Sequence, residues 1–289
     1  MARLLSLSLQ LLPAALFVGI FMLVPLGYAL VYSLLTAGTY GGVTWPPSVE
    51  AYVQVLFQRD WDDTLYFDPL YLRIFVRSLA LAVATTVLCA VLAVPLAWFV
   101  ATRPRAMRTR LIFLITLPFW VNSLIRTYCW VLLLRDQGLI NQGLQGLGLT
   151  EAPLGLMYNN GAILVGLVYN FLPFMVLPVY AALERIDLRI IDAGFDLYAR
   201  RWQVFTRIIL PLAMPGIRAG ALMVLAPAIG YYIIPDLLGG GQHLMVGNLI
   251  QIQFTSGRNW PFGAALSTLL TAAILALLWS GTARRRAGR

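Results

Sequence analysis

Six long apolar stretches dominate this chain of 289 residues and limit what it can fold into. A helix needs about 20 apolar residues to cross a hydrocarbon core of about 30 Å. Only 11% of the residues are charged, whereas a soluble domain carries about 25%. The sequence therefore predicts an all-α, polytopic membrane protein with one transmembrane domain over residues 1–289. Its six transmembrane helices are expected near 11–35, 74–101, 111–134, 161–183, 211–234 and 260–280.

The arginines alternate between the segments that connect these spans. Of the 21 arginines, 15 lie in segments on the side of the N-terminus, five lie on the other side, and Arg126 lies within a span. Basic residues accumulate on the cytoplasmic side of a membrane. We therefore expect both termini and residues 184–210 in the cytoplasm, and residues 36–72 and 236–258 in the periplasm. This topology accounts for the net charge of +9, so membrane lipid is an expected partner and nucleic acid is not.

Lysine is absent from the sequence, which excludes two kinds of chemistry. A Walker A loop needs a Lys for the phosphates, and a Schiff base with a carbonyl compound needs a Lys amine. Any ATP hydrolysis that drives this protein is therefore expected on another chain. We expect no enzyme activity, no catalytic residue and no cofactor in this chain. Cys89, Cys129 and His243 have no neighbours at metal-ligand spacing, so no metal site is expected either.

Residues 184–217 interrupt the apolar pattern with a charged, amphipathic stretch that is much longer than a turn. Its apolar positions recur near helical spacing, and Pro211 and Pro215 mark the start of the next span. The pattern favours a helix–turn–helix at the membrane surface. A short helix of this kind can seat in a groove of a partner and pass on the partner's movement. The alternative is a surface helix that only joins two spans, and the pattern alone favours that alternative.

The same stretch resembles the EAA loop of ABC-importer permeases, in which Glu-Ala-Ala is followed three residues later by Gly and then by Ile-x-Leu-Pro. The matching residues are Asp192-Ala193-Gly194 and Ile208-Ile209-Leu210-Pro211. Asp replaces the family's Glu, Gly194 replaces its second Ala, and Tyr198 stands at the Gly position, where the backbone bends. We refer to residues 184–217 as the coupling segment. The resemblance implies that contact with an ATPase subunit involves Asp192, Ala193, Gly194, Tyr198, Ala199 and Pro211.

Further blocks narrow the resemblance to the spermidine/putrescine (PotB/PotH-like) permeases. They are residues 118–128, 170–175, 183–187, 247–248 and 259–263. The resemblance implies the MetI-like fold of type I ABC importers, in a bacterial inner membrane. It also implies several partners: a second homologous permease, two ATPase subunits that bind ATP and Mg, a periplasmic substrate-binding protein and a polyamine substrate.

Polar and aromatic residues near the outer ends of the spans are candidates for handling a polyamine. An ammonium group is attracted to carboxylates and to aromatic faces, and a desolvated cation–π contact contributes about 2 kcal/mol. Asp236 follows Tyr231 and Tyr232 and precedes a run of three glycines, which is typical of an outer gate or of a capped helix end with interfacial tyrosines. The remaining candidates, which either line the path or bond neighbouring helices, are Asn122, Tyr169 and Asn170.

Arg126 would repel a polycation, so we interpret it as a structural anchor or as the partner of an outer carboxylate. Three other functions remain open. The first is the same class of transporter with another organic cation or small solute as substrate. The second is an autonomous carrier or channel, which the absence of a convincing internal repeat and the long coupling segment argue against. The third, a membrane enzyme, is least favoured because no span carries a nucleophile with a base.

Overall fold

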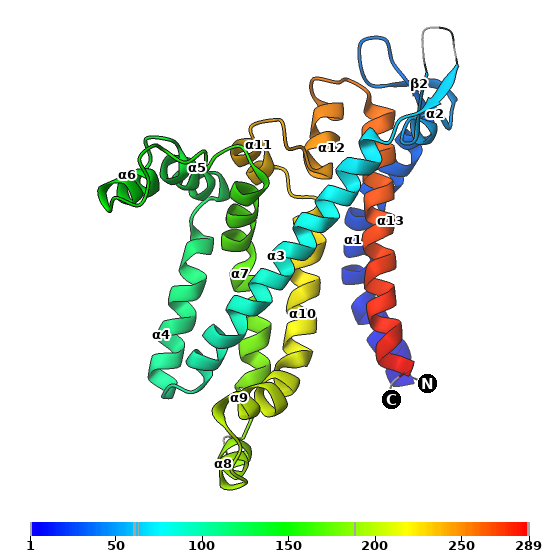
Figure 1. Cartoon of the computed structure of the whole chain (residues 1–289). Helices are drawn as coiled ribbons and strands as arrows, with labels where there is room; N and C mark the ends of the chain where they lie inside the picture. The colour runs from blue at the N-terminus through cyan, green and yellow to red at the C-terminus, as the bar shows by residue number, and fades with distance from the viewer. Residues whose placement is uncertain (1, 60–61, 63, 188, 288–289) are drawn as a thin grey trace. The chain divides into compact units, whose positions relative to one another are not determined.

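The computed structural model describes residues 2–59, 62, 64–187 and 189–287. The chain divides into two compact units, each with its own packing (Figure 1). The first comprises Met1–Arg73 and Leu249–Arg289, and the second comprises Ile74–Asn248. Two helices, α3 (Leu70–Ala101) and α12 (Val246–Phe254), begin in one unit and end in the other.

The first unit consists of two long helices and two small hairpins. Helix α1 (Ala2–Ser33) packs against α13 (Trp260–Ala287). The strands β1 (Leu35–Ala37) and β2 (Val43–Pro47) form one antiparallel pair, and β3 (Phe57–Arg59) and β4 (Leu65–Phe67) form another. The short helix α2 (Glu50–Val53) lies between the hairpins and contacts α13. The ring of Tyr71 meets that of Phe262 edge-on at 4.9 Å, which joins the chain after β4 to the start of α13.

The second unit has α7 (Asn160–Leu183) and α10 (Leu210–Ile229) at its centre. The two helices approach closely because glycines of α10 face α7. A Cβ atom at Gly216 would lie 2.5 Å from the carbonyl oxygen of Pro178, and Gly220 is packed against Met175 in the same way. Small residues therefore allow the two backbones to come together, as in many membrane helix pairs.

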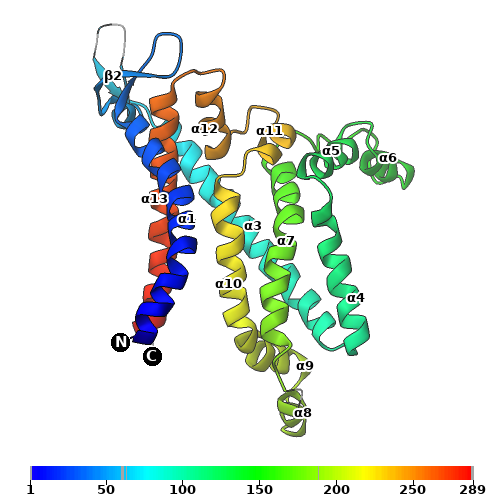
Figure 2. The same cartoon turned by 180° about the vertical axis from the view of Figure 1, so that it is seen from behind.

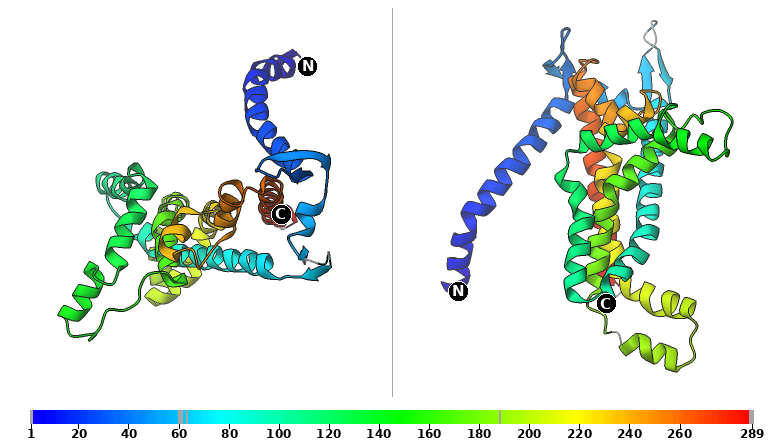
Figure 3. Two further views of the ribbon diagram at one scale, coloured as in Figure 1. Left: turned by 90° about the horizontal axis from the view of Figure 1, so that it is seen from above. Right: turned by 90° about the vertical axis from the view of Figure 1, so that its left-hand side faces the viewer.

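Shorter elements lie at the two ends of α7 and α10. At one end are α8 (Arg189–Asp196), α9 (Arg201–Val204) and the π-helical turn η2 (Phe205–Ile209), which leads into α10. At the other end are α5 (Ser123–Leu134), α6 (Leu139–Gly146) and α11 (Ile233–Gly239), as Figures 1 and 2 show. Because α8 and α9 project beyond the ends of α7 and α10, they are free to meet another molecule (Figure 3).

Five of the six expected spans are helices that are long and apolar enough to cross a membrane. Within the described residues these are Leu16–Ser33, Leu70–Ala101, Asn160–Leu183, Arg201–Ile229 and Trp260–Leu277. The sixth, expected as one span over 111–134, is instead broken. Helix α4 (Arg105–Thr116) and the 3-10 turn η1 (Leu117–Trp120) are bent by 90° from the following helices Ser123–Gly146.

The break has a local cause that the apolar composition conceals. Pro118 lies in η1, and a proline interrupts the hydrogen-bonding pattern of a helix. Asn122 then takes a non-helical conformation and caps a new helix, because its side-chain oxygen accepts a hydrogen bond of 2.8 Å from the backbone N–H of Leu124. The chain therefore starts α5 in a new direction instead of continuing α4.

Candidate coupling segment and outer substrate site

The coupling segment folds as the short helices α8 and α9 followed by η2. Helix α8 begins where the Asp187 carboxylate accepts a hydrogen bond of 3.0 Å from the N–H of Arg189. Its buried side faces η2, since a Cβ atom at Gly194 would lie 2.8 Å from the Cδ1 of Ile208. A small residue at this position of the family motif thus lets α8 lie directly on the turn that leads into α10.

Tyr198 stands at the Gly position of the EAA loop, so its backbone conformation decides whether the bend expected there is present. Its φ of 57° lies in the left-handed region. The N–H of Tyr198 donates to the carbonyl of Phe195 at 2.9 Å, and the N–H of Ala199 donates to that of Gly194 at 3.1 Å. These two bonds form a Schellman motif, the helix ending that usually places Gly at the left-handed position. The bend of the family motif is therefore retained here with a Tyr in place of the Gly.

The outer face of the coupling segment carries large apolar side chains with no cover in this chain. Leu197 is 82% exposed, Tyr198 96% and Trp202 72%. The Trp202 ring stacks on Phe205 with centroids 5.8 Å apart, which holds it in place. Asp192 and Ala193 are also exposed, whereas Ala199 is partly covered. Pro211, the last motif residue, lies in the first turn of α10, where a proline costs no hydrogen bond.

Leu197 and Trp202 are two of the apolar positions of the coupling segment, and the sequence pattern alone does not show in which direction they point. The structure shows that both point away from the fold instead of into it. Large exposed apolar side chains close together are typical of a protein-binding surface. Both residues follow Asp192, the first residue of the EAA-like motif, by fewer than twelve positions, so the sequence places them within the motif region. The direction in which they point depends on the turn at Tyr198.

At the opposite end of the second unit, Tyr231 joins three elements. Its hydroxyl is hydrogen-bonded to that of Ser123 at the start of α5, and its ring meets Phe171 of α7 edge-on at 5.5 Å. Phe171 in turn packs near Phe174, which meets Phe119 of η1 edge-on at 4.8 Å. An aromatic row thus runs from the broken span through α7 to the end of α10, and sequence reasoning found only Tyr231 in it.

The other outer candidates have different environments. Tyr232 is half-exposed, and its carbonyl accepts a hydrogen bond of 2.8 Å from the Asn248 side chain. Asp236 is exposed in the first turn of α11. In the part of the chain that the structure describes, no hydrogen bond or ion pair joins its carboxylate to Tyr231 or Tyr232. Asp236 is therefore available to a cation from solution, and the two tyrosines are held by their own partners.

The candidates on the broken span and α7 have mainly structural contacts. Asn122 caps α5, as described above. The ring of Tyr169 meets that of Trp130 at 5.5 Å, which ties α7 to α5. Asn170 is buried in α7. These contacts favour the interpretation in which polar residues bond neighbouring helices.

Of the two interpretations of Arg126, the contacts in the structure favour the structural anchor. Among the described residues Arg126 forms no ion pair, and its guanidinium lies 5.6 Å from the centre of the Phe119 ring. The Nε atom of Arg126 is buried without a hydrogen-bond partner. Arg126 is thus an anchor of α5 on η1 through a cation–π contact.

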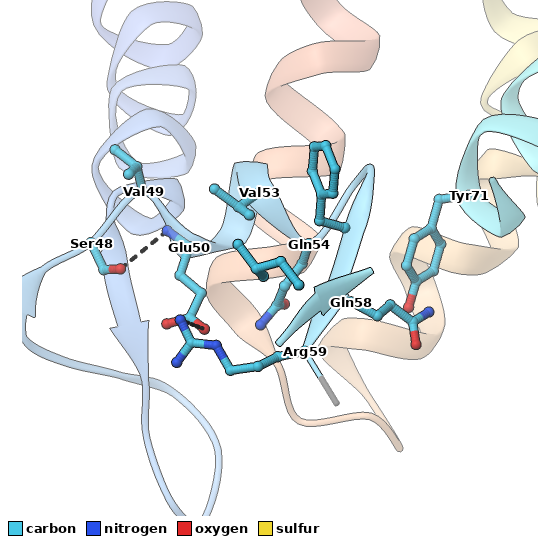
Figure 4. Close-up of a pocket in the computed structure, with 10 residues that line it drawn as sticks. Ser48, Val49, Glu50, Val53, Gln54, Gln58, Arg59 and Tyr71 are labelled. Carbon is cyan, nitrogen blue, oxygen red and sulfur yellow. Dashed lines mark hydrogen bonds and ion pairs between the residues drawn. The ribbon is translucent and has the colours of Figure 1, made fainter. Parts of the chain in front are cut away.

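The first unit contains a pocket of about 530 Å³ beside α2 and β3 (Figure 4). Its wall includes Glu50 and Arg59, whose side chains are 3.6 Å apart. The backbone N–H of Glu50 donates to the Ser48 hydroxyl at 3.1 Å, which fixes the start of α2. None of the candidate path residues is among the residues that line this pocket. Within the described residues no three His, Cys, Asp or Glu side chains are grouped for a metal ion.

Comparison with known proteins places this arrangement in a family. The family model "Binding-protein-dependent transport system inner membrane component" matches residues 91–286. The spermidine/putrescine transport system permease protein PotB of Escherichia coli K12 is 44% identical over 221 residues, which are 76% of this chain and 80% of that protein. PotB of Haemophilus influenzae is 40% identical over 258 residues, 89% of this chain and 86% of that protein.

A solved structure has the same fold at low sequence identity. It is a bacterial alginate ABC transporter in complex with an alginate pentasaccharide-bound periplasmic protein, with a TM-score of 0.71 and 17% identity. The likeness covers 97% of this chain and 93% of the compared chain. The chain therefore belongs to the binding-protein-dependent transport system inner membrane components, in the PotB-like branch of that family.

Proposed function

We propose that this protein is the permease subunit of an ATP-driven importer and forms half of the path for spermidine or putrescine across the inner membrane. The observation that carries the proposal is the projecting coupling segment, which exposes Leu197, Tyr198 and Trp202 beyond the ends of α7 and α10. The names of the PotB relatives support the choice of a polyamine. The partners are a second permease, two ATPase subunits that bind ATP and Mg, and a periplasmic binding protein.

The geometry suggests how ATP hydrolysis on another chain drives this one. Helix α8 seats in a groove of the ATPase through its exposed apolar side chains. Because the coupling segment continues directly into α7 at one end and α10 at the other, a movement of the ATPase displaces both helices. Their glycine-mediated contact makes them move as a pair. The row of aromatic rings that crosses the middle of α7 then changes its packing, which opens the path alternately to the two sides.

The proposal assigns the outer side a role in attracting the substrate. The segments expected outside are 36–72, 236–258 and also 135–160, between the third and fourth spans, and together they carry eight of the 12 acidic residues. An opening lined by charges of one sign concentrates ions of the other sign. Asp236 is exposed near Tyr232, so an ammonium group can meet a carboxylate and an aromatic face in succession. The whole chain, residues 1–289, acts as one permease domain in this proposal, and it hydrolyses no ATP itself.

Reconstitution tests the proposal. The chain is co-purified with its partner permease, ATPase and binding protein, and placed in vesicles that contain ATP. We expect uptake of labelled spermidine or putrescine that requires both the binding protein and ATP. Vesicles without ATP and vesicles without binding protein are the controls. Uptake that continues in either control would identify an autonomous carrier, and transport of another cation in preference to both polyamines would correct the substrate.

A further inference from the structure

A cluster of charged side chains joins the turn between α3 and α4, helix α4 and the C-terminal end of α7. The Nη1 atom of Arg108 in α4 lies 3.5 Å from the Oε1 of Glu184. The Nε–H of Arg108 donates a hydrogen bond of 2.6 Å to the carbonyl oxygen of Arg103, in the turn between α3 and α4. One guanidinium thus joins the α3–α4 turn to the residue that ends α7. We refer to Arg103, Arg108, Tyr180 and Glu184 as the arginine clasp.

Each side of the arginine clasp is anchored on the fold. Tyr180, in the last turn of α7, is only 8% exposed, and its hydroxyl interacts electrostatically with both Glu184 and Arg108. On the α3 side, the guanidinium of Arg103 lies 4.1 Å from the centre of the Phe99 ring. The arginine clasp therefore connects Arg103, which is held against Phe99 of α3, with Tyr180, which is buried in α7.

Glu184 has a special position in the chain. It is the C-terminal cap of α7 and also the first residue of the coupling segment. Helices α7 and α10 are already bound to each other where Gly216 meets Pro178, so both follow the coupling segment. Helix α4 also packs against α7, and among the described residues the ion pair of Arg108 with Glu184 joins α4 to the C-terminal end of α7.

We propose that Arg108 is a positioning residue that ties the α3–α4 turn to Glu184, so that a movement of the coupling segment is passed to α3 and α4 as well as to α7 and α10. This inference rests on the proposed function. Arginine suits the role because it keeps its charge at any physiological pH and holds two acceptors with one planar group. The side chains of Arg108 and Glu184 are 26% and 46% exposed, and ion pairs with this exposure contribute little to stability. Removing the pair therefore tests coupling and not folding.

The experiment compares uptake and ATP hydrolysis in the reconstituted complex. We expect Arg108→Gln and Glu184→Gln each to lower the number of polyamine molecules imported per ATP by about threefold to fivefold, while hydrolysis stimulated by the binding protein continues. The matched control is Arg110→Gln, which removes a neighbouring charge of α4 that takes no part in the arginine clasp. This control should import as the unmodified protein does.

An exchange of charges separates positioning from a general loss of structure. Arg108→Glu combined with Glu184→Arg restores the ion pair but not the hydrogen bond to the Arg103 carbonyl, so it should recover part of the import per ATP that either single charge reversal loses. Normal coupling in the two Gln variants, or an exchanged pair no better than the single reversals, would overturn the inference. The variant Ala193→Arg is measured in parallel. If it uncouples transport while Arg108→Gln does not, only this inference fails; if Ala193→Arg also couples normally, the proposed role of the coupling segment fails.

Discussion

Among single residues, Tyr198 shows most directly how the family motif is kept with an altered sequence. Its left-handed backbone closes α8 through two hydrogen bonds, although the residue is not Gly. This conformation costs an L-residue about 1 kcal/mol. The ring is 96% exposed and has no buried contact in this chain that offsets the cost. A partner that covers the ring would offset it, which agrees with a docking role for this face.

The first prediction concerns this strain. Tyr198→Gly should be more stable than Tyr198→Ala by about 1 kcal/mol, because only Gly relieves the left-handed backbone. The thermal midpoint of the purified complex in detergent measures the difference. Both variants lack the ring, so both should import less polyamine per ATP if the ring docks on the ATPase. Equal midpoints for the Gly and Ala variants would show that the turn carries no strain.

The second prediction concerns Asp236, whose carboxylate is exposed on α11. Asp236→Asn keeps the size of the side chain and removes its charge. An exposed charge contact contributes at most about 1 kcal/mol, so uptake at limiting substrate should fall by about twofold to fivefold. The control is Asp136→Asn, an outer acid that is not among the candidates. Wild-type uptake by Asp236→Asn at limiting polyamine would make Asp236 a structural residue.

Among the elements, the break between η1 and α5 and the helix α8 have the clearest consequences. The break turns an expected span into two helices at 90° and places Ser123 against Tyr231. Helix α8 presents Asp192 and Ala193 on its exposed side while Gly194 faces η2. Both elements are short, so their ends determine their geometry more than their interiors do.

The third prediction tests the cap that starts α5. Asn122→Ala should lower the stability of the complex by about 1 kcal/mol, because the N–H of Leu124 loses its acceptor. Asn122→Asp retains a capping oxygen and should stay close to the unmodified protein. Thermal unfolding followed by tryptophan fluorescence gives the comparison. If the Ala and Asp variants unfold together, the cap does not stabilise the break.

The fourth prediction tests the docking face of α8. Ala193→Arg should uncouple transport from hydrolysis, because a long charged side chain prevents α8 from seating in an apolar groove. The protein should still insert and assemble with its partners. Ala193→Ser adds only one oxygen and serves as the tolerated control. Undiminished uptake by Ala193→Arg vesicles would mean that α8 does not dock through this face.

At the scale of the whole molecule, the distribution of charged residues along the chain predicts an orientation in the membrane. The second unit has α8 and α9 at one end and α5, α6 and α11 at the other. The arginines of residues 184–217 belong to the basic group that we place in the cytoplasm. In the first unit, Tyr40 precedes β2 and is 90% exposed, in a segment that we place outside.

The fifth prediction is therefore a labelling pattern. After Cys89 and Cys129 are replaced by Ser, Tyr40→Cys should react with a membrane-impermeant thiol reagent added outside cells with a permeabilised outer membrane. Arg200→Cys should react only after the inner membrane is opened. Labelling is read as a mass increase of the purified chain. Reaction of the cysteine at position 200 in intact inner membranes would reverse the orientation.

The sequence by itself determined the place of five apolar helices, because hydrocarbon thickness sets a length that can be counted along the chain. It also located the coupling segment, since a charged run between two spans stands out by composition. Five spans match helices of the structure. The resemblance to the spermidine/putrescine permeases required no knowledge of the fold either, and the PotB relatives confirm it.

Tertiary structure decided which side chains meet. Ser123 and Tyr231 are 108 positions apart in the chain. The guanidinium of Arg126 lies over the Phe119 ring of η1 and not beside an outer carboxylate. The partner of Arg108 likewise comes from a helix that lies far along the sequence. Apolar composition is a property of each segment alone, whereas such pairs depend on how close two backbones come. That distance is set by glycines, prolines and caps whose effect appears only when the helices pack.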